Sequence, residues 1–123
     1  MKLTIKGRLP GLNDYISAER SNRYEAAKMK REAEELVTWS AKASRLKKFP
    51  EPCVMHYRWF EATRKRDKDN ISGYGRKVIQ DALVKAGYLR GDGWAHIEGF
   101  TDSFFVDKKD PRIEVIIEGS KHD

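Results

Sequence analysis

The stretch Lys65-Arg66-Asp67-Lys68-Asp69-Asn70 joins the clearest strand of this sequence to its clearest helix. Before it, residues 53–61 alternate between two sets of side chains, which predicts a strand with one strongly apolar face. After it, apolar residues recur at helical spacing between positions 71 and 86, and Gly87 is a typical helix end. The chain is therefore expected to leave a sheet and enter a helix at this stretch.

Further elements are expected on both sides of this strand–helix unit. In chain order they are a strand over residues 1–9, a short helical or irregular piece over 12–18, a helix over 20–47, a strand within 94–106, and a last strand through Ile113, Val115 and Ile117. The long helix is expected to end before the prolines at 50 and 52. In the third strand, the expected packing residues are Phe100, Phe104, Phe105 and Val106. The fold class predicted is α/β (α+β): one domain over residues 1–123, with a small mixed sheet of about four strands and two main helices packed on it.

Composition and charge narrow the possible partners. The chain has 123 residues, 25 Lys and Arg against 19 Asp and Glu, and a net charge of +6, which favours polyanionic partners such as nucleic acid. No apolar run reaches the roughly 20 residues of a membrane helix, and the N-terminus lacks the apolar core of a signal peptide. Cys53 is the single cysteine, so no internal disulfide can form. We expect a soluble, cytoplasmic protein without a membrane partner.

Two acids inside the opening stretch are the first candidate site. Asp67 and Asp69 point the same way if this segment is extended, because side chains alternate along extended backbone. Two carboxylates held together repel each other unless a cation or a shared proton neutralises them, and Mg²⁺ prefers carboxylate oxygens. The alternative is that both acids cap the following helix while Lys65, Arg66 and Lys68 screen their charge.

Two further polar residues follow in the chain. Lys77 lies roughly 140° from the centre of the apolar stripe of its helix, so it should project away from the core. Asp92 lies in the turn Gly91-Asp92-Gly93; it is either ordinary turn chemistry or a third acid that returns to the pair if the helix packs across the sheet. The histidines at 56, 96 and 122 show no zinc-ligand spacing.

Several motifs together resemble the RusA family of Holliday junction resolvases, found in bacteria and their prophages. They are Arg66-Asp67-Lys68-Asp69-Asn70, Asp81-Ala82-Leu83-Val84-Lys85-Ala86-Gly87, then Asp92, and a final strand of the type Arg112-Ile113-Glu114-Val115. The similarity runs from about residue 58 to the C-terminus, and earlier in the chain it rests on the order of elements and on Asn13.

The resemblance implies a chemistry and a set of site residues. It implies an Mg²⁺-dependent endodeoxyribonuclease, with Mn²⁺ as a possible substitute, that acts as a homodimer in recombination and repair and resolves four-way junctions by paired symmetric nicks. The implied metal-binding carboxylates are Asp67, Asp69 and Asp92, and the implied catalytic lysine is Lys77. Because the stretch before Asp81 is about one helical turn longer than in the best-known member, Arg76 is a rival for the role of that lysine. The residues expected to contact DNA are Lys65, Arg66, Lys68, Asn70 and Arg76.

Two other interpretations stay open. One is a non-catalytic basic module that binds branched or single-stranded nucleic acid, with the acids serving as helix caps. The other is a degenerate prophage resolvase kept as a structural remnant. Metal-dependent turnover separates both from an enzyme.

Overall fold

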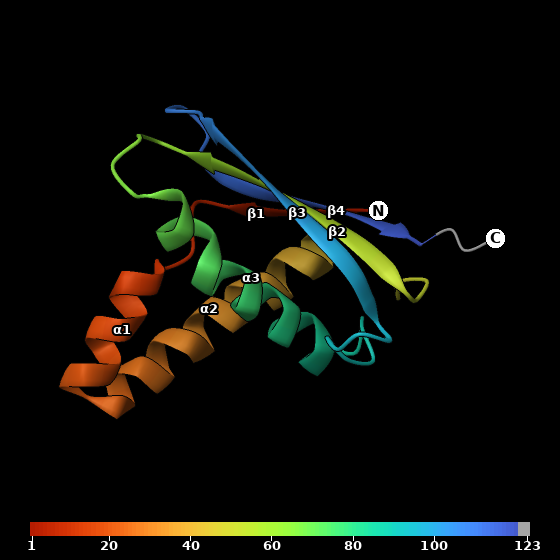
Figure 1. Cartoon of the computed structure of the whole chain (residues 1–123), viewed down its shortest axis with the longest axis horizontal. Coiled ribbons are helices and arrows are strands. Elements are labelled where there is room, and N and C mark those ends of the chain that lie inside the picture. The colour runs from red at the N-terminus through yellow and green to blue at the C-terminus, as the bar shows by residue number, and fades with distance from the viewer. Residues whose placement is uncertain (121–123) are drawn as a thin grey trace.

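The chain folds as a single α+β domain, seen here in a computed structural model that describes residues 1–120. Its elements, in chain order, are β1 (Lys2–Lys6), α1 (Leu12–Ser21), α2 (Arg23–Ala43), β2 (Cys53–Glu61), α3 (Lys68–Lys85), β3 (Ile97–Val106) and β4 (Arg112–Gly119) (Figure 1). The polar tail at residues 121–123, which includes His122, lies outside the described residues. In the described part of the chain, no helix is both long enough and apolar enough to cross a membrane.

The sheet has four strands in the order β1-β4-β2-β3. Strand β4 is antiparallel to both of its neighbours, whereas β2 and β3 are parallel. Parallel neighbours need a crossover connection, and α3 supplies it. The predicted mixed sheet of about four strands is therefore confirmed, and α3 begins where β2 ends and returns to the opposite end of the sheet, where β3 starts.

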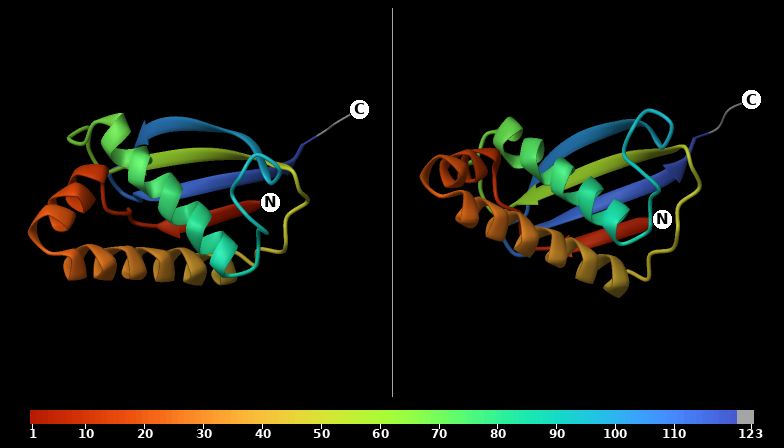
Figure 2. Two further views of the ribbon diagram at one scale, coloured as in Figure 1. Left: turned by 60° about the horizontal axis from the view of Figure 1, so that its bottom comes forward. Right: turned by 90° about the horizontal axis from the view of Figure 1, so that it is seen from below.

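All three helices cover the same face of this sheet (Figure 2). The buried face of the strands consists of alternating positions, as the sequence predicts: Leu3, Ile5, Cys53, Met55, Tyr57, Trp59, Ile113, Val115 and Ile117. Helix α3 adds the stripe predicted for it, through Ile71, Tyr74, Val78, Ile79, Ala82 and Leu83. At its end, Tyr88 N donates to Leu83 O (2.9 Å) and Gly87 has a φ of 86°, so Gly87 ends the helix as expected.

The helix predicted over residues 20–47 is confirmed as α2, but both of its ends were misplaced, since α2 runs from Arg23 to Ala43. Residue Asn22 has extended backbone (φ −165°, ψ 114°), and its Oδ1 accepts a hydrogen bond from Tyr24 N (2.8 Å), so α1 ends and α2 begins there. At the other end, Arg45 takes a φ of 55° and Leu46 N donates to Ala41 O (3.0 Å), which ends the helix before residue 47. The fold therefore has the two main helices predicted, α2 and α3, and the short helical or irregular piece predicted over residues 12–18 is the helix α1.

The predicted packing of the third strand is correct for one residue of four. Phe104 lies partly buried against the core, but Phe100, Phe105 and Val106 are 49%, 45% and 50% exposed. The reason is that β3 is an edge strand and pairs with β2 alone. Apolar content in a strand predicts burial only where other elements cover that strand.

Candidate active site at the start of α3

Asp67 lies immediately before α3, after the end of β2, and Asp69 lies in the first turn of α3. Asp67 has extended backbone (φ −67°, ψ 153°) and its carbonyl accepts from Ile71 N (3.0 Å), so it is the N-cap residue of α3. Its side chain, however, makes no capping hydrogen bond. Both Asp67 and Asp69 are exposed, and within residues 1–120 no ion pair engages either carboxylate. Capping by the two side chains is therefore not what the structure shows, and both carboxylates remain available to a ligand.

The start of α1 lies directly against the start of α3. Asn70 Oδ1 accepts a hydrogen bond from Asn13 N (2.8 Å), and a Cβ atom at Gly11 would lie 2.6 Å from that same oxygen. One helical turn further on, the rings of Tyr15 and Tyr74 stack with their centroids 4.5 Å apart. Asn70 thus links two helices, and the DNA contact expected of it stays a prediction.

Arg66, one of the residues predicted to contact DNA, forms contacts within the protein. Its guanidinium forms a two-pronged ion pair with Glu61 (2.8 and 2.9 Å) and donates to Leu9 O (3.0 Å). The side chains of Arg66 and Glu61 are only 12% and 10% exposed. The last residue of β2 points its carboxylate to the helix side, where a buried charge needs a partner, and Arg66 is that partner. A phosphate would have to compete with this buried ion pair, and the DNA contact expected of Arg66 stays a prediction.

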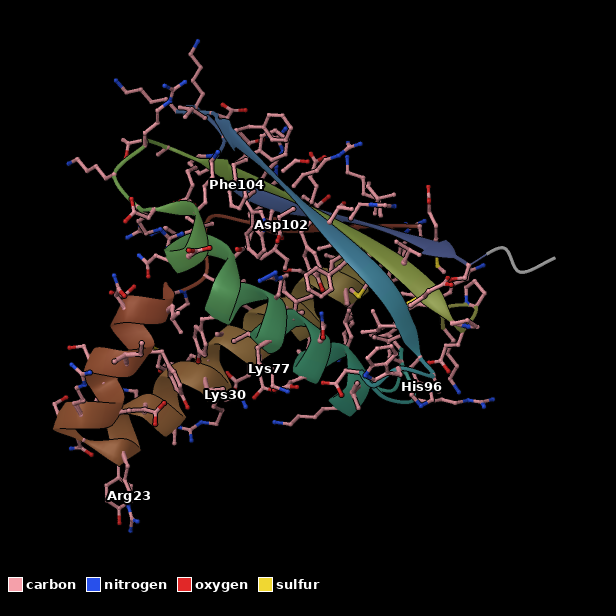
Figure 3. The ribbon with its side chains drawn as sticks, viewed as in Figure 1. Arg23, Lys30, Lys77, His96, Asp102 and Phe104 are labelled. Atoms are coloured by element: carbon pink, nitrogen blue, oxygen red, sulfur yellow. The ribbon has the colours of Figure 1, made fainter. Side chains whose placement is uncertain are left out.

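A pocket opens at this end of the sheet, and it has acidic, basic and apolar walls. Asp67 and Asp69 line it together with Lys68, whose Nζ lies 5.6 Å from the ring centroid of Phe104. Figure 3 shows Phe104 at the end of β3 that lies nearest the start of α3. Lys65 is also exposed in the loop that leads into the helix. Two available carboxylates thus lie among cations that an anionic ligand can reach.

Lys77 lies eight residues further along α3, on the exposed side that the sequence predicts, with 61% of its side chain exposed. Its Nζ contacts Asp81 Oδ1 (3.0 Å) and Asp92 Oδ2 (3.4 Å), and Asp81 also pairs with Lys30 (3.1 Å) from α2. Figure 3 shows Lys30 and Lys77 close to each other. The hydrogen bond to Asp81 raises the pKa of Lys77. Burial raises the pKa of Asp81, but the hydrogen bonds from Lys77 and Lys30 outweigh it and the net direction is downward.

The loop that carries Asp92 is held in place by Glu51, which lies just before β2. Glu51 Oε1 accepts from Arg90 N (2.8 Å), and Glu51 Oε2 lies 3.1 Å from His96 Nδ1. The hydrogen bond from Arg90 is the main reason that the pKa of Glu51 is lowered. Beyond these anchors the loop projects into solvent, since Asp92 is exposed and the side chain of Trp94 is fully exposed.

The three carboxylates predicted as one metal site are divided between two places. In residues 1–120, no three acidic, histidine or cysteine side chains lie close enough to hold one ion. From Asp69 to Lys77, the partner of Asp92, α3 rises about 12 Å, whereas an Mg²⁺ ion needs oxygen ligands at about 2.1 Å. The physical reason is the direction of α3: the helix carries the chain away from Asp67 and Asp69 before the loop with Asp92 begins.

Arg76 connects α3 to the edge strand. Its Nη1 donates to Asp102 Oδ2 (2.9 Å), its guanidinium lies 4.6 Å from the ring centroid of Phe100, and Trp59 Nε1 donates to Asp102 Oδ1 (2.9 Å). Arg76 and Lys77 are both ion-paired, but the side chain of Arg76 is 23% exposed and that of Lys77 is 61% exposed, so Lys77 is the cation that a ligand reaches more easily. Neither Asp102 nor Glu61 was predicted to be a site residue. Both could have been noticed from the alternation of their strands, which places these two acids on the helix-facing side among aromatic residues.

Comparisons with known proteins add nothing to this site: no protein-family model and no curated protein matches the chain. Function must therefore be argued from the site itself and from the motif resemblance.

Proposed function

We propose that the protein is a metal-dependent endonuclease of branched DNA, which resolves four-way junctions by paired nicks during recombination and repair. The observation that carries the proposal is the pair Asp67 and Asp69: two exposed carboxylates without a protein partner among the described residues, at a pocket rimmed by cations. Both carboxylates line the same pocket, and oxygen ligands of this kind are the ones that a divalent cation such as Mg²⁺ prefers. The motif resemblance, which includes these two residues, supports the same reading.

Each side chain in this proposal has a defined task. Asp67 and Asp69 supply hard oxygen ligands to Mg²⁺ or Mn²⁺, and the bound ion supplies Lewis acidity toward the scissile phosphate. Lys65 and Lys68 bind the neighbouring phosphates through charge, which gives binding that depends on salt and tolerates sequence. Lys77 is the cation proposed to neutralise charge that develops on the reacting phosphate. Asp92 is the proposed third carboxylate.

The non-catalytic alternative has one observation in its favour. Within one described chain, Asp92 and Lys77 lie apart from Asp67 and Asp69, so a single copy lacks the compact site that phosphodiester hydrolysis requires. A basic protein with this arrangement could bind branched or single-stranded nucleic acid without cutting it.

The decisive experiment is a cleavage assay on a labelled four-way junction. The wild-type protein with Mg²⁺ should give paired nicks on opposing strands, and EDTA should abolish them. Asp69→Asn should lower cleavage at least about 100-fold because it removes a metal ligand. Junction binding by this variant should be unchanged or tighter, since one negative charge near the DNA is gone.

Glu32→Gln is the matched control for the charge. Glu32 lies on α2 with 62% of its side chain exposed, and its removal changes the net charge by the same amount. This variant should cut like the wild type. Tight binding without cleavage by the wild type, under Mg²⁺ and under Mn²⁺, would favour the non-catalytic alternative.

A further inference from the structure

The face of the sheet that the helices leave open carries one row of stacked side chains. All three helices lie on the other face (Figure 2). Phe60 lies between the buried residues Trp59 and Glu61, so the alternation of β2 points its ring to the open face. The strand register places Arg112 of β4 on one side of Phe60 and Phe105 of β3 on the other. These three side chains form a stacked row that crosses the sheet toward its β3 edge.

The stacked row ends at an aromatic ring that is open to a further flat group. The Arg112 guanidinium lies 3.8 Å from the centroid of the Phe60 ring, and the rings of Phe60 and Phe105 are 4.8 Å apart with 19° between their planes. Strand β3 is the edge strand, so among residues 1–120 no strand continues the row. Phe105 is accordingly 45% exposed. Nearly half of its surface is available to a ligand.

Hydrogen bonds hold the first member of the stacked row in one position. Arg112 donates to Glu114 Oε2 and to Asp107 Oδ2 (2.8 Å each), and to the carbonyl oxygen of Asp110 (2.9 Å). The ring of Phe60 is thereby packed between a fixed guanidinium and the ring of its β3 neighbour. A surface that is already ordered before a ligand arrives loses little conformational freedom on binding. The stacked row is therefore a preorganised platform.

Cations lie beside the open end of the stacked row. Phe105 lines the pocket at the start of α3 together with Arg64 and Lys68, and both of these cations are exposed. Lys108 and Lys109, also exposed, lie in the turn between β3 and β4. An aromatic surface bordered by cations suits a ligand that carries flat rings on a chain of phosphates. Single-stranded nucleic acid has this chemistry.

We infer that Phe105 is a base-stacking site, on which an unpaired nucleobase of DNA extends the stacked row while Arg64 binds a neighbouring phosphate. The choice of DNA as the ligand rests on the function proposed above. Unstacking a base costs least where the base is already unpaired. The site therefore favours DNA with unpaired bases over a continuous duplex, a distinction that contacts to phosphate alone do not make.

Two oligonucleotides with the same number of phosphates separate stacking from charge. One is a short oligothymidylate, and the other is the same sugar-phosphate chain without bases. Each carries a fluorescent label and is titrated with the wild-type protein in EDTA, with fluorescence anisotropy as the readout. The chain with bases should bind about 5- to 150-fold more tightly, which is the contribution of one stacked base. Equal affinities would mean that only phosphates are bound, and they would overturn the inference.

Substitutions at position 105 test the ring itself. Phe105→Ala and Phe105→Leu should each bind oligothymidylate at least about fivefold more weakly and the base-free chain unchanged, whereas Phe105→Trp should keep the affinity of the wild type or exceed it. Leucine keeps apolar packing against Phe60, so the fold survives in this variant and circular dichroism verifies it. Trp39→Ala is the matched control, because Trp39 is an aromatic residue of α2 with 73% exposure, and its loss should not change binding. Wild-type affinity in Phe105→Leu, or an equal loss in Trp39→Ala, contradicts the inference.

Nuclear magnetic resonance observes the contact directly and without cleavage. The chain has five phenylalanines, so the ring signals of a phenylalanine-labelled sample are few, and those of Phe105 are the ones that disappear in Phe105→Leu. Oligothymidylate should shift these signals upfield, because a stacked base shields the ring, and the base-free chain should not. A protein that cuts junctions but shows no such shift keeps the proposed function and loses the inference. A protein that stacks bases but cuts no junction, with Mg²⁺ or Mn²⁺, keeps the inference and loses the proposed function.

Discussion

Replacing Glu61 with glutamine tests the ion pair that supports the start of the candidate site. The substitution keeps the size of the side chain but leaves the guanidinium of Arg66 buried without a counter-charge. Removing one partner of a buried pair costs about 3–5 kcal/mol. Because both side chains keep about a tenth of their surface exposed, we take the lower end, about 3 kcal/mol. For a chain of this length, a loss of 1 kcal/mol in the free energy of unfolding lowers Tm by about 4 °C, so the expected fall in Tm is about 12 °C.

Thermal unfolding followed by circular dichroism, at one fixed protein concentration, measures this loss. Glu32→Gln is the same chemical change in an exposed pair (Lys28 to Glu32, 4.0 Å) and should cost less than about 1 kcal/mol. Replacing both members of the buried pair, as Glu61→Leu with Arg66→Met, should recover part of the lost stability, because no unpaired charge is then buried. A Tm for Glu61→Gln within about 2 °C of the wild type would refute the reasoning.

Two further predictions concern helix α3 and the basic loop before it. At Gly75 an added Cβ would lie 2.7 Å from the ring of Trp59, whereas at Gly73 it would lie an ordinary 3.5 Å from the nearest side chain. Urea unfolding should therefore show Gly75→Ala destabilised by about 1–3 kcal/mol, and Gly73→Ala stabilised by up to about 1 kcal/mol; equal effects at both positions would contradict this. Lys65→Ala should lower the slope of log K against log salt for junction binding by about 0.9, and Lys28→Ala, on α2, should leave it unchanged. An unaltered slope for Lys65→Ala would remove its phosphate contact from the proposal.

The elements with long, regular patterns were predictable from the sequence. Strand β2 and helix α3 each have an unbroken apolar face, and Gly87 ends the helix because glycine adopts a positive φ without strain. A break between α1 and α2 was predicted, but its position at Asn22 and the helix end at Arg45 were misplaced by two to four residues, because each depends on the conformation of one residue. Local preferences at a single position are weak, and neighbouring contacts decide them.

The candidate site was predictable only in part. Asp67 and Asp69 are close in sequence, so the local pattern alone identifies the pair. The position of Asp92 depends instead on the direction in which α3 crosses the sheet, which residue spacing does not encode. Arg66 was assigned to DNA because its basic neighbours suggest a phosphate-binding loop. Its partner in the structure is Glu61 at the end of β2, and burial of an acidic side chain there was not predicted.

The contact between Gly11 and Asn70 has a consequence for how this chain can evolve. The side chain of Asn70 occupies the space that a Cβ at position 11 would need, although the backbone of Gly11 itself (φ −81°) suits any residue. Position 11 is therefore restricted by a residue 59 positions away, since 70 − 11 = 59, and not by its own backbone. Among descendants of this sequence, a larger residue at position 11 and a smaller one at position 70 should arise together. Covariation of these two positions would record that the helix bearing the acidic pair and the first helix were selected as one unit.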